Sequence, residues 1–459
     1  MFRSCVAIGL PRTVADAGLA TRKLYTDSNG AVAIASPPNI RMPKALKLSL
    51  LAISVLLIVF VFLGGLLPGG VRAGTDASAY QQMEVYSEVL QYIQNDYVVT
   101  PNIPDVTNGA LHGLLEGLDP DSGYLTADEY KQYQAHETEN KAQIGVHISK
   151  RYGYATVVSV IPGSPADHAG IIDGDVIEEI GNQSTRVMPL QMIRMSLNGQ
   201  PGSTLHFSVI EPTSATPDAM TLTRALADYP AMHVDEYENS SILYLKPYDL
   251  SQNRVDDIVT KLRQVQSAGK KKILLDLRDV TGGNMDSAVQ LANAFLKSGT
   301  IATLQGQTYP KQTWTAEPKN FVTEAPLMVL VNHGTSGPAE IVAAALKDNK
   351  RAELVGDRTF GSGSVQKQIP LADGAMLFLS VAKYHTPDGD AIQDKAVTPN
   401  VVVAENNGFG LQTPAAPHGP VTVPTAPGAA KAAPAPPAPP QPDEQLNKAL
   451  ELLKQSKAA

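Results

Sequence analysis

The sequence predicts an α/β fold joined to a separate β domain, behind a membrane anchor and a small helical region. Three observations support this fold class. Between residues 240 and 403, continuous apolar segments such as KKILLDLRD and PLMVLVN alternate with amphipathic segments such as AEIVAAALKDN, as in a largely parallel sheet covered by helices. Residues 142–210 contain short β-type segments separated by turns. Residues 48–67 form an uninterrupted apolar run.

The composition is that of a folded, multidomain protein, and it excludes several classes of function. A chain of 459 residues is longer than one core usually organises. The formal charge of −8 and the lack of a Lys/Arg block give no reason to expect a nucleic-acid partner. A single cysteine, Cys5, excludes an internal disulfide framework and a Cys-rich zinc site. The nine histidines show no HExxH-type spacing, so we expect no metal and no cofactor.

The apolar run of residues 48–67, LSLLAISVLLIVFVFLGGLL, predicts a transmembrane signal anchor. Its length of about 20 residues can cross a hydrocarbon core of about 30 Å. Arg41, Lys44 and Lys47 precede it, so the positive-inside rule predicts a cytoplasmic leader over residues 1–47. The bulk of the chain would then lie on the periplasmic or extracytoplasmic side of the cell membrane as a single-pass protein.

Two alternatives to this anchor stay open. Val71-Arg72-Ala73 has small residues at the spacing of a signal cleavage site, so the run could instead be a cleaved signal peptide. A buried core helix is disfavoured because the run is apolar on every face. Met42 directly precedes the signal, so residues 1–41 are a candidate mis-assigned start.

Residues 75–140 predict a small helical region. Met83, Tyr86 and Val89 lie at helical spacing, and a second apolar face around Leu111 and Leu115 ends at Asp119-Pro120. We interpret these stripes as core or as a contact in a homo-oligomer.

Residues 141–213 follow a different pattern. GVHISK, ATVVSVI, DVIEEIG and LHFSVIE predict strands, with PADHAG as a short helix and DGD as a turn between them. The run VIPGSPADHAGIIDGDVIEEIG resembles a PDZ domain. This resemblance implies capture of an extended C-terminal peptide as an added strand, with loop N–H groups holding its carboxylate. The resemblance places that carboxylate-binding loop at Gln143, Ile144, Gly145 and Val146.

Residues 406–443 are rich in Pro, Ala and Gly and predict an extended linker. Residues 444–459 follow it, with Leu446, Leu450 and Leu453 at helical spacing, and predict a short amphipathic helix. A further hypothesis is that this tail and helix reach a partner in the cell envelope.

Taken together, residues 80–404 resemble the carboxy-terminal processing, or tail-specific, serine peptidases. The segments that carry the resemblance are LLEGLDPDSGYLTADEY, the PDZ run, ILLDLRDVTGGNMDSAVQLANAFL, GTSGPAEIVAAALKDNKRAELVGDRTFGSGSVQ and YHTPDGDAIQDKAVTPNVVV. The family implies a mixed α/β peptidase core of the ClpP/crotonase-like kind over residues 214–405. It also implies export, serine-type endopeptidase activity (peptide-bond hydrolysis) by a Ser/Lys dyad, and the C-terminal segments of proteins as partners. In such a dyad a lysine of lowered pKa removes the serine proton, and backbone N–H groups stabilise the oxyanion.

Both dyad positions are substituted in this sequence. Aligned on Glu340-Ile341, the family's catalytic serine falls on Gly337. The segment FGSGSVQ places the family's lysine at Ser362. By resemblance, Gln366 keeps a residue that supports the lysine, and Gly282 and Gly283 keep the oxyanion loop.

Two functional hypotheses follow. The first is an exported, membrane-anchored family member that captures protein C-termini and has lost the usual catalysis, which makes it a pseudoenzyme candidate. The second is an active peptidase that cleaves near C-termini with a shifted nucleophile, Ser336. One residue at a helix start turns a side chain by roughly 100°, so Ser336 would not point where the family serine points. Its alternative role is that of an N-cap or turn hydroxyl. His333 is the nearest candidate base in sequence.

Overall fold

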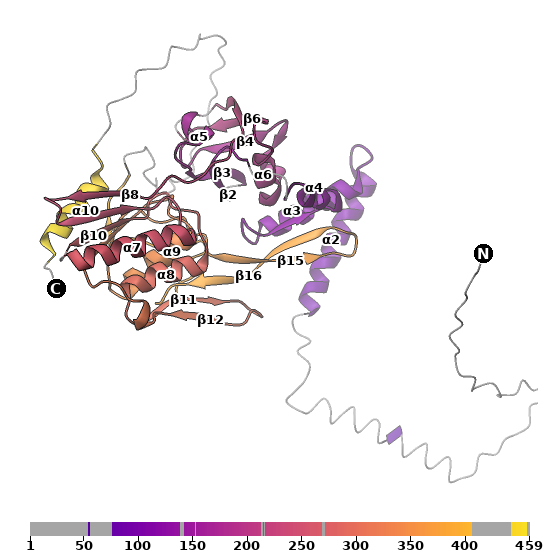
Figure 1. Ribbon diagram of the computed structural model, residues 1–459. Coiled ribbons are helices and arrows are strands. Elements are labelled where there is room, and N and C mark those ends of the chain that lie inside the picture. The colour runs from indigo at the N-terminus through magenta and orange to yellow at the C-terminus, as the bar shows by residue number, and fades with distance from the viewer. Residues whose placement is uncertain are drawn as a thin grey trace, which may run out of the picture. The chain divides into compact units, whose positions relative to one another are not determined.

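The computed structural model describes residues 54–55, 76–137, 142–151, 153–212, 214, 216–268, 271–405 and 442–456 (Figure 1). The chain divides into two compact units, the first ending at Val98 and the second beginning at Val99. Among the described residues, no helix is long and apolar enough to cross a membrane. The predicted anchor at 48–67 lies outside the described residues except for Ser54 and Val55.

Helix α2 (Asp76–Asp96) belongs to the first unit. It carries the predicted apolar stripe, yet Met83, Tyr86 and Val89 are exposed. Within the described residues this stripe therefore forms no core.

In the second unit, helices α3 (Ile103–Glu116) and α4 (Ala127–Glu137) flank strand β1 (Gly123–Leu125). The sequence predicted only helices here. β1 instead pairs antiparallel with β16 (Met376–His385), 250 residues further along the chain, and Leu125 pairs with Met376. Burial of Tyr124 and Leu125 explains this pairing, since a lone three-residue strand has no stability of its own.

The β domain is a sheet in the order β2-β3-β4-β6-β7, with β5 paired to β4. Four strands match the predicted segments: β2 (Val146–Arg151), β3 (Tyr154–Val160), β4 (Val176–Ile180) and β6 (Thr204–Ile210). Two strands were not predicted, β5 (Gln183–Ser184) and β7 (Asp218–Thr223), and β7 pairs with β6 beyond the predicted domain end at residue 213. Its helices are α5 (Pro165–His168), the 3-10 turn η1 (Thr185–Val187) and α6 (Leu190–Leu197). Ser164 caps α5 by accepting a hydrogen bond from the Asp167 N–H.

The α/β core contains a six-stranded sheet in the order β17-β14-β13-β10-β9-β8, parallel except for β8. Its strands are β8 (His233–Tyr237), β9 (Ile242–Lys246), β10 (Lys272–Asp276), β13 (Leu327–Val331), β14 (Glu353–Gly356) and β17 (Val401–Val402). Alternate residues face opposite sides, so Leu275 and Val329 pack under α7 (Gln252–Ala268), α8 (Met285–Phe295) and α9 (Pro338–Asp348). Leu274 and Leu330 face the other side.

Helix α10 (Glu444–Gln455) covers that other side, next to β10 (Figure 1). Ala449, Leu450 and Leu453 bury its apolar stripe on the sheet. Lys272 holds its C-terminal end by donating from Nζ to the carbonyl oxygens of Leu453 (2.6 Å), Lys454 (3.1 Å) and Ser456 (2.7 Å). The apolar face of this helix is therefore occupied within its own chain. Residues 406–441 of the tail lie outside the described residues, so the hypothesis of a partner for the tail stays a prediction.

A second sheet was not predicted from the sequence. It has the order β1-β16-β11-β12, and β15 also pairs with β16. Its further strands are β11 (Thr300–Gln305), β12 (Gln312–Thr315) and β15 (Ser364–Pro370), and the 3-10 turn η2 (Pro318–Asn320) follows β12. β15 and β16 mix buried and exposed residues and contain a bulge between Val365 and Gln366, so they lack a clear two-residue period.

Candidate functional site

The turn that connects β13 to α9 lies at the carboxyl end of the parallel sheet. All five residues of β13 are buried, and the chain then turns through Asn332–Gly337 into α9. The Ser336 N–H donates to the Val280 carbonyl (3.0 Å), and Thr335 Oγ1 donates to the Leu277 carbonyl (2.8 Å). These bonds fix the turn beside the loop that follows β10, which is where ligands of open α/β sheets bind.

Gly337 has a backbone conformation that few other residues adopt. Its φ of 60° and ψ of −118° lie in a region that glycine adopts freely but that strains a residue with a side chain. Serine nucleophiles of other hydrolases occupy strained strand-to-helix turns of this kind. A Cβ built on Gly337 would meet nothing within 4 Å, so the position where the family resemblance places the catalytic serine has room for a side chain.

Ser336, one residue earlier, is 7% exposed. Among the described residues, no amine or imidazole lies within hydrogen-bond distance of its Oγ. His333 does not serve as its base in this structure. Its ring instead packs against Phe360 and hydrogen-bonds to the Arg358 backbone. Burial, helped by the charge of Arg151, lowers the pKa of His333 to about 4, so the ring is neutral at pH 7.

Glu340 connects Gly337 and Ser362, the two positions that the resemblance assigns to the dyad. Its Oε2 accepts hydrogen bonds from the backbone N–H of Gly337 (3.0 Å) and from that of Ser362 (2.8 Å). Its Oε1 accepts from the Gly361 N–H (2.7 Å) and from the Thr359 hydroxyl. The side chain is fully buried, and this burial raises the pKa of Glu340 to about 7 against the opposing effect of the four donors.

Sequence analysis did not select Glu340, although a signal was present. A Glu three residues after the cap position, at the start of an apolar helix, is the acidic member of a capping box. The motif alone does not show that the carboxylate also accepts hydrogen bonds from the loop that contains Ser362.

Gln366 lies on β15 and is exposed. Its Nε2 donates to the hydroxyls of Ser364 (2.7 Å) and Ser380 (3.3 Å), and Ser364 in turn donates to Asp121 Oδ2 (3.0 Å). The structure therefore places Gln366 in a network with Asp121 through Ser364, which lies two residues beyond the position that the resemblance assigns to the lysine. Asp121 was another residue that sequence analysis had not selected.

The oxyanion loop proposed at Gly282 and Gly283 follows β10. The Gly282 carbonyl accepts from the Leu250 N–H (2.8 Å), while neither glycine N–H donates to an acceptor among the described residues. Gly283 has a φ of 129°, and a Cβ there would lie 2.5 Å from the Leu250 carbonyl oxygen. Both N–H groups are thus available to a ligand. A side chain at Gly283 itself would collide with Leu250.

The β domain contacts this loop directly. Ser159 on β3 hydrogen-bonds to Thr281 (3.0 Å), and His147 on β2 hydrogen-bonds to the Tyr229 hydroxyl. Burial, with a smaller effect of Arg194, lowers the pKa of His147 to about 4, and burial raises the pKa of Tyr229 to about 12. Arg151 also donates to the Phe360 carbonyl (3.0 Å) and lies over the Phe360 ring.

The proposed carboxylate-binding loop precedes β2. Gln143 exchanges both backbone hydrogen bonds with Ala225, so its N–H is already used. The N–H groups of Ile144 and Gly145 donate to no acceptor among the described residues, while Val146 enters the β2–β3 ladder. Gly145 has a φ of 94°, and a Cβ there would collide with Ser164.

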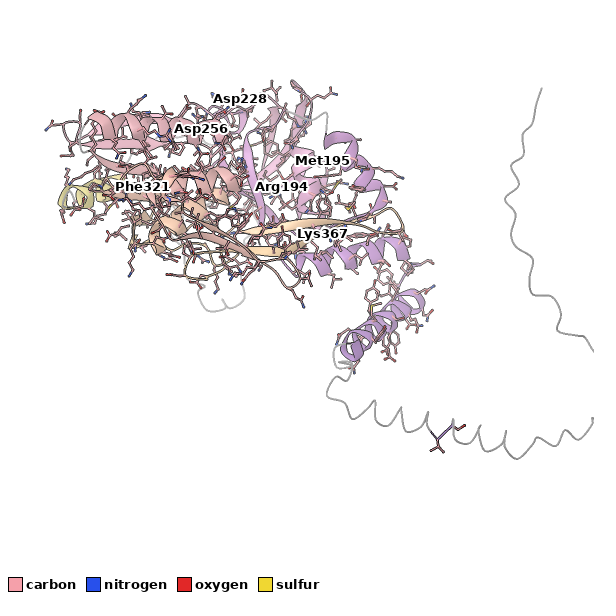
Figure 2. All side chains as sticks on the ribbon, turned by 60° about the horizontal axis from the view of Figure 1, so that its bottom comes forward. Arg194, Met195, Asp228, Asp256, Phe321 and Lys367 are labelled. Carbon is pink, nitrogen blue, oxygen red and sulfur yellow. The ribbon has the colours of Figure 1, made fainter. Side chains whose placement is uncertain are left out.

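Strand β2, at the edge of its sheet, contacts helix α6 next to this loop, and we call the edge of β2 that faces α6 the groove. Arg194 on α6 (Figure 2) donates across it to the Ile148 carbonyl (3.3 Å) and lies 3.8 Å from Asp121 Oδ1. An added peptide strand would use the same carbonyl for a ladder hydrogen bond. Among the described residues, no group of three or more His, Cys, Asp or Glu side chains could hold a metal ion.

Comparison with known proteins gives two family matches. The profile of Peptidase family S41 matches residues 241–403, and that of the PDZ domain matches residues 156–210. The chain is 32% identical to the carboxyl-terminal-processing protease of Picosynechococcus sp. over 65% of this chain and 72% of the relative. It is 28% identical to the carboxy-terminal-processing protease of Bartonella bacilliformis, over 73% of this chain and 78% of the relative.

A carboxy-terminal processing protease of Bacillus subtilis is also 28% identical, over 72% and 71% of the two chains. Among solved structures, the photosystem II D1 C-terminal processing protease superposes with a TM-score of 0.58 at 23% identity, over 70% of this chain and 92% of that one. This last likeness concerns the fold alone.

Proposed function

Because the chain belongs to the S41 family of carboxy-terminal processing proteases and carries a PDZ domain, we propose that it captures protein C-termini beside a peptidase site without the usual Ser/Lys pair. The single observation that carries this proposal is that Gly337 and Ser362, the two dyad positions by resemblance, share one oxygen of Glu340. In this proposal the two positions stay together while the two reactive side chains are replaced.

The remaining parts of the site support binding more than hydrolysis. The free N–H groups of Gly282 and Gly283 could accept the carbonyl oxygen of a bound chain. An added strand in the groove would displace Arg194 from the Ile148 carbonyl, and the N–H groups of Ile144 and Gly145 would hold its terminal carboxylate. Without a base, a serine hydroxyl near these groups remains a weak nucleophile.

The second candidate function is hydrolysis with Ser336 as a shifted nucleophile. The names of the relatives favour it, since those compared above are called proteases. The absence of an amine or imidazole near Ser336 Oγ among the described residues counts against it. A base could reach Ser336 only after the turn or the β domain rearranges.

The experiment that separates the two candidates compares cleavage with capture. Purified wild-type protein and Ser336→Ala are incubated with an unfolded substrate labelled at its C-terminus. Binding is followed by fluorescence anisotropy and hydrolysis by gel mobility. We expect binding without hydrolysis, equal in both proteins. Hydrolysis that Ser336→Ala abolishes would overturn the loss of catalysis and establish the second candidate.

We also propose that the protein is anchored in the membrane and faces the periplasmic or extracytoplasmic side. The uncharged run of residues 48–67 and the preceding basic residues support this proposal. In membrane fractions the chain should resist extraction by high salt and be digested by protease added outside intact spheroplasts. Complete release by salt would contradict the anchor.

A further inference from the structure

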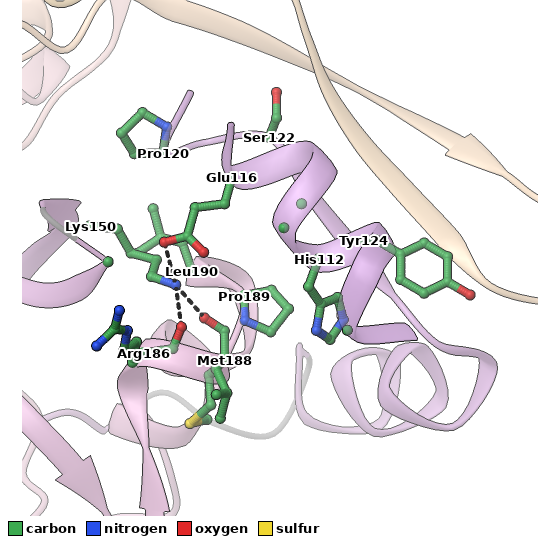
Figure 3. Close-up of a pocket in the computed structure, with 15 residues that line it drawn as sticks. His112, Glu116, Pro120, Ser122, Tyr124, Lys150, Arg186, Met188, Pro189 and Leu190 are labelled. Atoms are coloured by element: carbon green, nitrogen blue, oxygen red, sulfur yellow. Dashed lines mark hydrogen bonds and ion pairs between the residues drawn. The ribbon is translucent and has the colours of Figure 1, made fainter. Parts of the chain in front are cut away.

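A cavity of about 410 Å³ lies between helix α3 and the segment that leads into α6 (Figure 3). Its volume is in the range of small-molecule and side-chain pockets. Neither the peptidase site nor the proposed carboxylate-binding loop contributes to its wall. The mechanism proposed above therefore leaves this cavity without a role.

The cavity begins where the proposed peptide groove ends. Lys150 on β2 and Leu190, the first residue of α6, both line it. A peptide that adds antiparallel to β2 with its carboxylate near Ile144 and Gly145 runs upstream toward Lys150. Counting one residue for each residue of β2, the peptide position facing Lys150 is about four residues before the terminal one.

The cavity wall contains an ion pair between Lys150 and Glu116. Lys150 is 7% exposed, and its ammonium contacts Glu116 Oε1 (3.2 Å) and the carbonyl oxygens of Arg186 (3.2 Å) and Met188 (3.0 Å), as drawn in Figure 3. Lys150 and Glu116 therefore neutralise each other, and all three ammonium protons have acceptors.

Two nitrogen-bearing groups in the wall, the guanidinium of Arg186 and the ring of His112, remain without a hydrogen-bonded carboxylate among the described residues. Among the described residues, the Arg186 guanidinium has no carboxylate partner and lies only over the Tyr154 ring, at 5.7 Å. The Nε2 atom of His112 is buried without a hydrogen-bond partner, and its nearest carboxylate oxygen, on Glu129, is 3.8 Å away. A guanidinium and an unused ring nitrogen are the groups that a carboxylate ligand satisfies.

Helix α3 leaves room for such a ligand. Gly109 and Gly113 line the cavity four residues apart, and therefore on one helix face. A Cβ built on either glycine would meet nothing within 4 Å.

We propose that this cavity is a subsite for the captured peptide, which receives a carboxylate side chain about four residues upstream of the C-terminus. Arg186 pairs with this side chain, and His112 supplies a further hydrogen bond. The inference rests on the proposed capture of C-termini and adds to it the substrate class: protein tails with an acidic residue at that position.

The test uses the full chain in detergent and fluorescent octapeptides with identical last four residues. The residue just before these four is Glu, Gln or Lys, and each peptide is made with a free and an amidated C-terminus. Binding is measured by anisotropy for wild type, Arg186→Gln and the control Arg263→Gln, an exposed arginine on α7. We expect the Glu peptide to bind wild type and Arg263→Gln about 10-fold more tightly than the Gln peptide, and Arg186→Gln to lose this preference.

Gly113→Leu provides a second variant that fills the cavity while it favours the helix. It should lose the Glu preference with unchanged or higher thermal stability. If free-acid peptides bind but show no Glu preference, or keep it in Arg186→Gln, the subsite is refuted while capture stands. If free-acid and amidated peptides bind equally, or neither binds, the proposed capture fails and the subsite fails with it.

Discussion

Gly337 and Ser362 donate their backbone N–H groups to the same oxygen of Glu340, at 3.0 and 2.8 Å. They are 25 residues apart in the sequence, and each occupies a position that the family resemblance assigns to a catalytic side chain. The shared carboxylate holds the start of α9 against the loop before β15. One buried carboxylate therefore holds together the two positions that the resemblance assigns to a dyad.

Restoring both side chains should restore peptidase activity. Gly337→Ser combined with Ser362→Lys supplies a nucleophile and a base, and a positioned base contributes about 10²–10⁴-fold to the rate. Each single variant should stay inactive. Hydrolysis of a C-terminally labelled unfolded protein is the measurement. A double variant that is folded, binds substrate and cleaves nothing would contradict this expectation.

The same Gly337→Ser change should cost stability. A serine at a φ of 60° is strained by about 1–3 kcal/mol. Gly163→Ser is the matched control, because Gly163 has a φ of 78°, also has open space around its Cβ, and lies in a turn of the PDZ domain. Urea unfolding should show similar losses for both variants. No loss in Gly337→Ser would mean that the turn relaxes into an ordinary conformation.

Glu340→Gln should loosen the loop that contains Ser362. The amide keeps one acceptor oxygen for four donors, and it places an NH₂ group against N–H groups, at a cost of about 1–3 kcal/mol for each unpaired group. Hydrogen exchange at Gly361 and Ser362 should accelerate. Glu353→Gln, an exposed change at the start of β14, is the control and should change neither exchange nor stability. Unchanged protection in Glu340→Gln would show that other contacts hold the loop.

His147 should make stability depend on pH. Burial lowers its pKa from 6.5 to about 4, so between these values the unfolded chain binds a proton that the folded protein does not. The free energy of unfolding therefore falls as the pH drops from 6.5 toward 4, by at most about 1.4 kcal/mol per pH unit. His147→Gln keeps a partner for Tyr229 and does not titrate. Relative to wild type, this variant should therefore be more stable at pH 4.5 than it is at pH 7.

The control for that titration is His206→Gln, at an exposed histidine on β6. Comparing the responses of the two variants to pH isolates the contribution of the buried ring of His147. A pH-independent difference for His147→Gln would mean that the folded protein already admits a proton to this site.

Helix α10 should stabilise the α/β core. Leu453 is 1% exposed on the sheet, so Leu453→Ala should lower the free energy of unfolding by about 2–5 kcal/mol. The exposed Glu451 on the same helix is the control, and Glu451→Ala should have little effect. Equal stability of Leu453→Ala and wild type would show that the helix is not bound to the sheet in solution.

Sequence periodicity was sufficient for the elements whose contacts are local or repetitive. The buried strands β10 and β13 and the amphipathic helices α8 and α9 follow from apolar patterns, and the strands of the PDZ domain follow from its turns. The second sheet did not follow, because β1 and β16 have no pattern of their own and β1 is stabilised by pairing with a strand far along the chain. Only part of the site was predicted from the sequence. Its loops were located by strand ends, while the roles of Glu340 and Asp121 depend on contacts between distant segments.

The sequence by itself determined which residues stand at this site: a glycine and a serine occupy the two positions that the resemblance assigns to the dyad. Only the tertiary structure decided that these two positions meet at one buried carboxylate, that Ser336 has no base beside it among the described residues, and that α10 returns to its own sheet. The physical reason is that residue identity fixes chemistry position by position. Proximity, by contrast, is set by burial of apolar faces whose partners lie far away along the chain.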